Sequence, residues 1–244
     1  MLTKGNNFIY SNGIKCKSMI LKKLIVVIPT RNEENTIESV IKQIPRNLAK
    51  NTKIVIIDKS NDTTPFKAEK AGALVIKQPS GGLGTAFRLG IKTGIKLDAD
   101  ILMHVDGDFQ YDPKEMPSLL RPILSGEADM VLGRRLLHYR MPIIRRVGNK
   151  FFSWLVSKCT SIRISDAQTG YRALNRRALK ILSSLKEDYT YTQESIVVGA
   201  KNGLRIREVP IVFRKRLHGC SFVNIFFYPI KVLGIIVRAY FREL

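Results

Sequence analysis

The sequence predicts an α/β fold with a mostly parallel, doubly wound sheet. Continuously apolar stretches of strand length, as expected of central parallel strands, recur along the first half of the chain. Segments whose apolar residues follow helical spacing lie between these stretches, and strands that alternate with helices in this way are typical of parallel sheets. With 244 residues, the chain is most simply one such domain with additions at its ends.

The first half of the chain is expected to contain five strands, most of them followed by a helix. These strands span residues 21–30, 53–57, 73–76, 100–103 and 128–132. The first helix is expected to open at residues 31–34, where acidic side chains suit the helix dipole, and to end at Pro45. Its apolar positions follow helical spacing: Ile37, Val40, Ile41 and Ile44. Further helices are expected at residues 65–71, 81–94 and 113–124.

The second half begins with a basic, aromatic helix at residues 143–156. It continues with a loop at 166–172, helices at 176–185 and 193–202, and a strand at 204–213. No linker or internal repeat divides the chain. We therefore expect one domain over residues 21–220, a polar N-terminal arm over residues 1–20 and a separate amphipathic segment over residues 221–244.

The charge balance favours a polyanionic partner. Forty-one Lys and Arg against 20 Asp and Glu give a net charge of +21. Such a balance suits nucleic acid, an anionic membrane surface or a phosphate-rich substrate. The excess is spread along the chain rather than gathered in a tail, which argues against a simple nucleic-acid-binding arm.

The cysteines and apolar runs indicate a reduced protein without a membrane span. Cys16, Cys159 and Cys220 show neither paired spacing nor a zinc-type pattern. The first residues lack the apolar core of a signal peptide. No run of about 20 apolar residues occurs, so no transmembrane helix is expected.

Residues 221–244 have the pattern of an amphipathic helix at a membrane interface. Lys231, Arg238 and Arg242 fall within a narrow arc of a helical wheel, and the other positions are mostly apolar. The positive charge suits an anionic leaflet. Packing of this helix on the core or on a partner subunit is the alternative.

Polar clusters follow successive strands, at residues 30–34, 58–62, 81–84 and 106–110. The carboxyl ends of parallel strands meet at one edge of the sheet, where ligands bind. Asp106, Asp108 and Gln110 alternate along a chain expected to be extended, so they could present oxygens to one divalent cation that holds phosphates. An isolated Asp-Gly-Asp is better explained as a solvated turn, but its place among these loops favours the metal site.

Six motifs stand in these polar stretches and in the second half of the chain. They are VVIPTRNEENTI, IIDKSNDTT, GGLGTAFRLGI, HVDGDFQYDP, DAQTGYRALNRRAL and VPIVFRKRLHGCS. In this order they closely resemble glycosyltransferase family 2, and within it the branch of dolichol-phosphate mannose synthases and polyprenyl-phosphate glycosyltransferases. The resemblance extends from about Leu24 to the C-terminus.

The resemblance implies a GT-A fold and an inverting transfer of a hexose, mannose or glucose, to a polyprenyl (dolichyl-type) phosphate. It implies GDP-mannose or UDP-glucose as the donor and Mg²⁺ or Mn²⁺ as the cofactor. The enzyme would act at the cytoplasmic face of a membrane, as a peripheral or interfacial protein. Nucleic acid is not an expected partner, whereas a membrane-protein partner or a homo-oligomer is compatible with the resemblance.

The resemblance also assigns roles residue by residue. Asp106 and Asp108 match the family's metal ligands, and Gln110 matches the acidic or amide position after them. The nucleotide-contacting loops are matched by Pro29, Thr30, Asn32, Glu33, Asp58 and Ser60. Gly82 and Gly84 match glycines that contact phosphate, with a plain helix entry as the alternative. Basic positions that face donor or acceptor phosphates are matched by Arg135, Arg146 and Arg216, so catalysis falls to Asp106, Asp108, Arg135 and Arg216.

The chain departs from the family pattern at two places. Where the family commonly has Asp-Asp-Gly-Ser, residues 57–60 are Ile-Asp-Lys-Ser, which leaves the nucleotide open. Residues 219–222 lack the family's lysine, which leaves the acceptor contacts open. Asp166 and Gln168 either shape the acceptor loop or form a turn, and His104 is interpreted as a core histidine.

An acceptor phosphate is already ionised, so its attack needs no general base. Two alternatives remain. A glycan or lipid hydroxyl as acceptor would require a base, for which Glu194 is the near candidate. A non-enzymatic basic module on the same fold is the other alternative, although no recognisable nucleic-acid-binding motif supports it.

Overall fold

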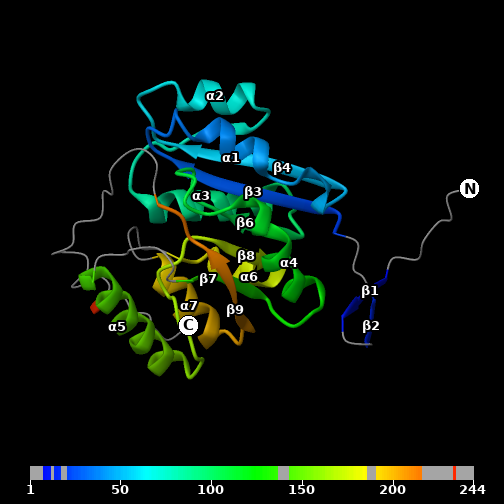
Figure 1. The fold of residues 1–244 in the computed structure, drawn as a ribbon, viewed down its shortest axis with the longest axis vertical. Coiled ribbons are helices and arrows are strands. Elements are labelled where there is room, and N and C mark those ends of the chain that lie inside the picture. The colour runs from blue at the N-terminus through cyan, green and yellow to red at the C-terminus, as the bar shows by residue number, and fades with distance from the viewer. Residues whose placement is uncertain are drawn as a thin grey trace, which may run out of the picture.

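The computed structural model describes residues 8–11, 14–17, 21–136, 143–185, 191–215 and 233–234. Its centre is a seven-stranded sheet in the order β5-β4-β3-β6-β8-β7-β9 (Figure 1). The strands are β3 (Lys23–Thr30), β4 (Asn51–Asp58), β5 (Leu74–Lys77), β6 (Ile101–His104), β7 (Met130–Leu136), β8 (Arg172–Asn175) and β9 (Ile206–Val212). Only β8 runs antiparallel to its neighbours within this sheet, so the predicted mostly parallel α/β fold is confirmed.

Two further strands, β1 (Phe8–Ser11) and β2 (Ile14–Lys17), pair with each other in the N-terminal arm. The helices are α1 (Ile37–Gln43), α2 (Thr64–Lys70), α3 (Leu83–Lys96), α4 (Met116–Leu124), α5 (Ile143–Thr160), α6 (Arg176–Leu182) and α7 (Tyr191–Lys201). Short 3₁₀ turns cover Arg46–Leu48 and Pro113–Glu115. Within the described ranges, no helix combines the length and apolarity that crossing a bilayer requires.

Helices cover both faces of the sheet, which gives the doubly wound arrangement. Buried residues of α3, α5, α6 and α7 form a core on one face, and those of α1, α2 and α4 form a core on the other. Gly90 and Gly94 let α3 approach the sheet closely, because a Cβ at either position would lie 2.6 Å from the side chain of Val27 or Leu102. This packing fixes the strand ends from which the site loops emerge.

The first helix begins later than the sequence predicts. The expectation of a helix from residues 31–34 is wrong, because α1 starts at Ile37. Asn32 has a left-handed backbone with a φ of 57°. The backbone N–H groups of Asn32 and Glu33 donate to the side chains of Ser60, in the loop after β4, and Thr64, the first residue of α2. Residues 31–36 are therefore part of the carboxyl edge of the sheet.

Strand β8 was not predicted. The sequence analysis runs from a loop at residues 166–172 directly to a helix, whereas residues Arg172–Asn175 insert as a short strand between β6 and β7. Four residues that begin with Arg172 and end with Asn175 give too little alternation to show a strand. Because β8 is antiparallel, the loop that precedes it lies at the same edge as the carboxyl ends of the parallel strands.

Asp129 joins β7, β8 and β9 at the edge of the sheet that lies opposite the carboxyl ends of the parallel strands. Its carboxylate is buried and accepts hydrogen bonds from the Arg205 side chain at 2.9 and 3.0 Å, and from Asn175 Nδ2 at 2.8 Å. The Arg205 backbone N–H also donates to it at 3.0 Å. Hydrogen bonds from Arg205 hold the pKa of Asp129 well below its usual value.

We expect Asp129→Asn to lower the free energy of unfolding at pH 7 by about 1–3 kcal/mol, because a neutral amide at this buried position cannot accept all of the hydrogen bonds from Arg205 and Asn175. The folded-state pKa is depressed, so this contribution is complete above about pH 4 and is lost as the pH falls below that value. Urea unfolding at pH 7 and below pH 4 measures both effects. A difference between wild type and variant that does not shrink in acid would contradict the assignment.

Candidate active site

The loops that follow β3 and β4 meet at the carboxyl edge of the sheet. Thr30 Oγ1 donates to Asp58 Oδ1 at 2.7 Å, and the Asn32 N–H donates to Ser60 Oγ at 2.8 Å. Thr36 Oγ1 extends this network to the loop after β6, since it donates to the carbonyl of Gly107 at 2.8 Å. The predicted convergence of the polar loops is therefore observed, with Pro29 at the end of β3 among them.

Asp58 is the centre of the β3–β4 side of the site. The residue is buried, and its carboxylate accepts from Thr30 Oγ1, from Ser60 Oγ at 2.6 Å and from the Ser60 N–H at 3.1 Å. Lys59, one of the two residues of this loop that depart from the family pattern, donates through Nζ to the carbonyl of Gly81 at 2.8 Å. Lys59 thus connects the second loop to the glycine-rich loop.

The glycine-rich loop leads directly into α3. Gly82 is the N-cap of this helix, and Gly84 is buried in its first turn. Gly81, which the sequence analysis did not single out, has a φ of 81°, and a Cβ there would overlap the Thr85 side chain. The sequence signal that could have identified it is the Gly-Gly pair at residues 81–82, because glycine is the residue that adopts a left-handed backbone without strain. Gln78 Nε2 supports the loop by donating to the carbonyl of Gly82 at 3.0 Å.

The Asp-Gly-Asp stretch is a turn and not an extended chain. β6 ends at His104, and Phe109 has a left-handed φ of 62°. The expectation that strand alternation aligns Asp106, Asp108 and Gln110 is therefore wrong, because a turn sets the directions of these side chains. Asp108 is buried, and its Oδ1 accepts from the Gln110 N–H at 3.0 Å.

The other two predicted metal ligands have different surroundings. Gln110 Nε2 donates to the carbonyl of Arg214 at 3.1 Å, so the amide nitrogen is directed toward the end of β9. The half-buried Asp106 lies against Gly170, where a Cβ would be only 2.9 Å from Asp106 Oδ2. Asp106 therefore sits between the turn and the loop before β8, residues 165–171, which we call the β8 loop.

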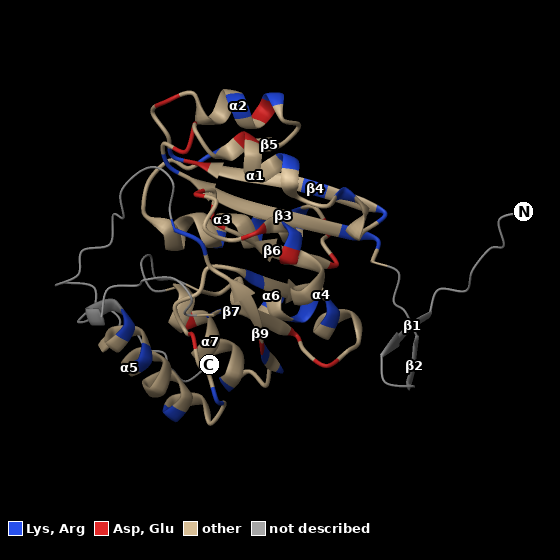
Figure 2. Cartoon of the chain, in the orientation of Figure 1, with Lys and Arg blue, Asp and Glu red and all other residues tan. Residues whose placement is uncertain are grey.

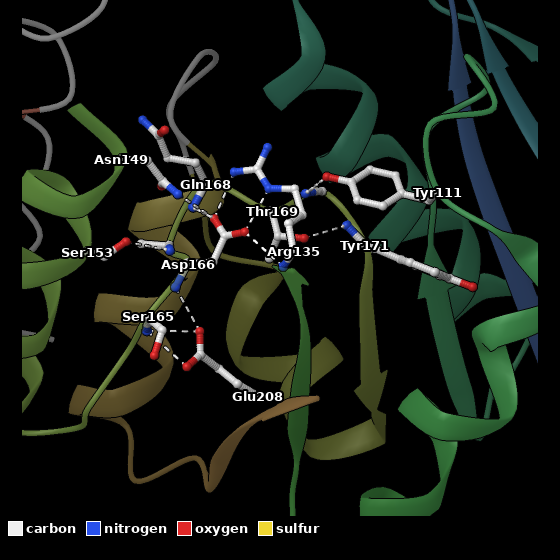
Figure 3. Close-up of polar contacts among 12 residues, drawn as sticks. Tyr111, Arg135, Asn149, Ser153, Ser165, Asp166, Gln168, Thr169, Tyr171 and Glu208 are labelled. Atoms are coloured by element: carbon white, nitrogen blue, oxygen red, sulfur yellow. Dashed lines mark hydrogen bonds and ion pairs between the residues drawn. The ribbon is translucent and has the colours of Figure 1, made fainter. Parts of the chain in front are cut away.

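Arg135 of β7 and Asp166 of the β8 loop form a buried ion pair (Figure 3). Arg135 Nε donates to Asp166 Oδ2 at 2.7 Å, Nη2 donates to Oδ1 at 2.8 Å, and the backbone N–H of Arg135 lies 3.2 Å from Oδ2. Asn149 Nδ2 of α5 adds a bond to Oδ1 at 3.1 Å. Burial opposes ionisation of Asp166, but the hydrogen bonds and charge of Arg135 prevail and lower its pKa.

Further hydrogen bonds hold the β8 loop from several directions (Figure 3). The carboxylate of Glu208 accepts the N–H groups of Ser165 and Asp166 at 2.8–2.9 Å, and Ser153 Oγ accepts that of Ala167 at 3.0 Å. The Gly170 N–H donates to the hydroxyl of Tyr111 at 3.1 Å. Burial raises the pKa of Tyr111 to about 12, so this phenol keeps its proton. Asp166 Oδ1 also accepts from the Gln168 N–H at 3.3 Å, so the buried Asp166 both forms a turn and holds the β8 loop together.

His104 is a fully buried residue, as predicted, and it also bonds to the β8 loop. Its Nδ1 lies 2.8 Å from the carbonyl oxygen of Gly170. Burial lowers its pKa to about 4, so the ring is neutral at pH 7. A carbonyl oxygen only accepts, so Nδ1 carries the proton.

The sequence analysis missed several of these supporting residues: Tyr111, Asn149, Ser153 and Glu208. Only Tyr111 had a signal, since it stands in the HVDGDFQYDP motif. Glu194 is buried in the first turn of α7, and Arg146 is half-buried on α5. Arg216 lies outside the described residues, as does the helix predicted over residues 221–244 apart from Leu233 and Gly234.

The motifs at this edge agree with a comparison against known families. The sequence model for glycosyl transferase family 2 matches residues 25–182. The chain belongs to glycosyl transferase family 2. It is therefore a glycosyltransferase, as the resemblance predicts, and the roles of its individual site residues are proposals.

Relatives of this family 2 glycosyltransferase include two named archaeal enzymes. The chain is 34% identical to a dolichyl-phosphate hexose transferase of Haloferax volcanii, over 79% of this chain and 83% of that protein. It is 28% identical to a UDP-N-acetylglucosamine–dolichyl-phosphate N-acetylglucosaminyltransferase of Methanococcus voltae, over 78% and 85%.

A solved structure confirms the fold. Glucosyl-3-phosphoglycerate synthase from Mycobacterium tuberculosis, in complex with Mn²⁺, UDP and phosphoglyceric acid, superposes with a TM-score of 0.73. The match covers 91% of this chain and 80% of that chain at 20% identity. The predicted GT-A fold is thus confirmed.

We expect Asp166→Leu to lower the free energy of unfolding by about 3–5 kcal/mol, because it leaves the buried charge of Arg135 unpaired. The double variant Arg135→Met with Asp166→Leu should lose less than the sum of the two single variants, since neither charge is then left unpaired. Urea unfolding of the four proteins measures this coupling. Additive losses would contradict a direct interaction.

Proposed function

We propose that this glycosyltransferase transfers a hexose, with inversion and with the help of a divalent metal, from a nucleotide-sugar to a polyprenyl phosphate of the dolichyl type. The observation that carries the proposal is the position of Asp106 and Asp108, in a turn where the polar loops of four parallel strands and the β8 loop meet. The names of two archaeal relatives support the acceptor.

Asp106 and Asp108 fit a hard divalent cation, Mg²⁺ or Mn²⁺. Both supply carboxylate oxygens from one turn, the ligand type that these cations prefer. Among the described residues, no cluster of three or more His, Cys, Asp or Glu side chains forms a complete cage. This agrees with a cation that also takes phosphate oxygens of its substrate. When bound, the metal would stabilise the negative charge of the departing nucleoside diphosphate.

The donor nucleotide is assigned to the loops after β3, β4 and β5. Thr30, Asn32, Ser60 and Asp58 are tied together there by short hydrogen bonds. The relative from Methanococcus voltae is named for a UDP-sugar, and the mycobacterial neighbour contains UDP, so uridine nucleotides are the first donors to test, with GDP-mannose beside them.

The acceptor is assigned to the side of the β8 loop. The buried pair of Arg135 and Asp166 fixes this loop. Two further cations, Arg214 and Arg216, follow β9 in the sequence. An ionised phosphate attacks the anomeric carbon without a base. The burial of Glu194 on α7 gives no support to a hydroxyl acceptor that would need one.

The deciding experiment incubates the protein with polyprenyl phosphate, Mg²⁺ or Mn²⁺, and radiolabelled UDP-glucose, UDP-N-acetylglucosamine or GDP-mannose in turn. We expect one donor to label the lipid, and the anomeric configuration of the product to be inverted. Label found only on a hydroxyl acceptor would overturn the proposed acceptor. Turnover that persists in EDTA would overturn the proposed role of the metal.

We expect Asp106→Asn and Asp108→Asn each to reduce transfer roughly a hundredfold or more, because each removes a charge that stabilises the metal and the leaving group. Asp98→Asn is the matched control: this exposed carboxylate lies at the opposite end of β6 and pairs with Arg176. Initial rates are measured together with circular dichroism. A site variant that keeps its rate would remove that residue from the metal site.

Gly170→Ala tests the contact between the β8 loop and Asp106. The new Cβ would lie 2.9 Å from Asp106 Oδ2, so the carboxylate must move, and we expect a loss of rate of about tenfold to a hundredfold. Gly148→Ala on α5 is the control, because a Cβ there meets nothing within 4 Å. Equal rates for the two variants would show that Asp106 does not depend on the β8 loop.

A further inference from the structure

Helix α5 presents an unusual outer face. Val147, Phe151 and Trp154 are 60%, 50% and 55% exposed, although they occupy one stripe at positions i, i+4 and i+7. The rings of Phe151 and Trp154 lie 6.1 Å apart. Three large apolar side chains on one helical face are more than the isolated exposed residues that a soluble surface normally carries.

Cations accompany this stripe and acids are absent from it. Between Asp129 and Asp166 the sequence has no Asp or Glu, and Figure 2 shows Lys and Arg along α5 without an acidic residue. Lys150 and Lys158 are exposed on the same helix. We call Val147, Lys150, Phe151, Trp154 and Lys158 the outer face of α5.

A shallow hollow of about 370 Å³ adjoins the C-terminal end of the outer face. It is lined by Trp154, Ser157, Lys158, Ser161, Ile162 and Arg163. An aromatic ring beside two cations and hydroxyl groups is the combination that suits the boundary between acyl chains and phosphate headgroups.

The opposite side of α5 is fixed to the protein. Phe152 and Val156 are buried in the core that α5 shares with α7. Asn149, Ser153 and Ser157 form a polar seam along this side: they bond to Asp166, to the Ala167 N–H and to the Ile164 N–H. The helix is therefore bound to the β8 loop on one side and exposes apolar and cationic groups on the other.

We propose that the outer face of α5 lies on the surface of an anionic lipid bilayer and so brings the β8 loop to a lipid acceptor. The choice of a bilayer follows from the charge, since an anionic leaflet attracts Lys and Arg while its acyl boundary takes the apolar stripe. The function of this contact, to bring the β8 loop to a lipid acceptor, rests on the proposed function. The binding of α5 to the bilayer requires neither the donor nor the acceptor.

Trp154 is the only tryptophan of the chain, so its fluorescence reports on this face alone. The full-length protein is mixed with vesicles of phosphatidylcholine, with or without phosphatidylglycerol. We expect a blue shift of the emission, and quenching by brominated acyl chains, with the anionic vesicles and much less with the neutral ones.

Two variants and two matched controls test the residues. Val147→Ser with Phe151→Ser should weaken partitioning into anionic vesicles roughly tenfold, whereas Phe66→Ser on α2, where the side chain is 66% exposed, should not. Lys150→Gln with Lys158→Gln should weaken it by a similar factor and reduce its salt dependence. Lys92→Gln with Lys96→Gln on α3 makes the same change in net charge and should have little effect.

Several outcomes would overturn the proposal. Emission that does not respond to anionic vesicles, or that responds equally in the double-serine variant, would do so. Trp154 already shielded from acrylamide without lipid would show that another part of the chain covers it, and a shift that follows protein concentration would indicate a second copy.

Transfer assays separate this inference from the proposed function. With a short-chain polyprenyl phosphate in detergent, the double-serine variant should retain the wild-type rate, and with the same lipid in vesicles it should lose rate. Failure to bind vesicles with normal transfer in detergent would reject only the outer face. Normal binding without transfer from any donor would reject only the proposed function.

Discussion

The ion pair between Arg135 and Asp166 determines the geometry of the β8 loop of this glycosyltransferase. It joins β7 to a loop more than thirty residues further along the chain, and Asn149 adds α5 to the same carboxylate. Two buried charges are tolerated only when directional hydrogen bonds replace their water, and here the guanidinium and carboxylate meet side by side. The β8 loop thereby has one position, and Asp106 rests against its Gly170.

The β3–β4 side of the site is built differently. There the loops are joined by hydroxyl groups and backbone N–H groups around Asp58, and Lys59 bonds to a carbonyl oxygen rather than to a carboxylate. A carbonyl oxygen does not cancel the charge of an ammonium group, so Lys59 places a cation beside the glycine-rich entry to α3. The substitution that departs from the family pattern thus adds positive charge where the proposed donor diphosphate would approach.

The parallel half of the fold could be predicted from sequence because each strand there is a continuous apolar run followed by a polar loop. The same rule located the loops around Asp58 and Gly82 at one edge of the sheet. It failed where tertiary contacts override local pattern. The left-handed residues Asn32 and Phe109 replace an expected helix start and an expected strand, and β8 is too short and polar to be recognised. The partners of Asp166 come from three separate elements, so no spacing along the chain could reveal them.

The polar seam of α5 has one more consequence. Apolar helix contacts tolerate sliding by a turn, because one methyl group substitutes for another, but Asn149, Ser153 and Ser157 meet their partners at a single axial register. Slippage by one turn would leave buried donors without acceptors. The helix and the β8 loop must therefore move together as one rigid body. A displacement of α5 caused by contacts on its outer face would displace Asp166 by the same amount.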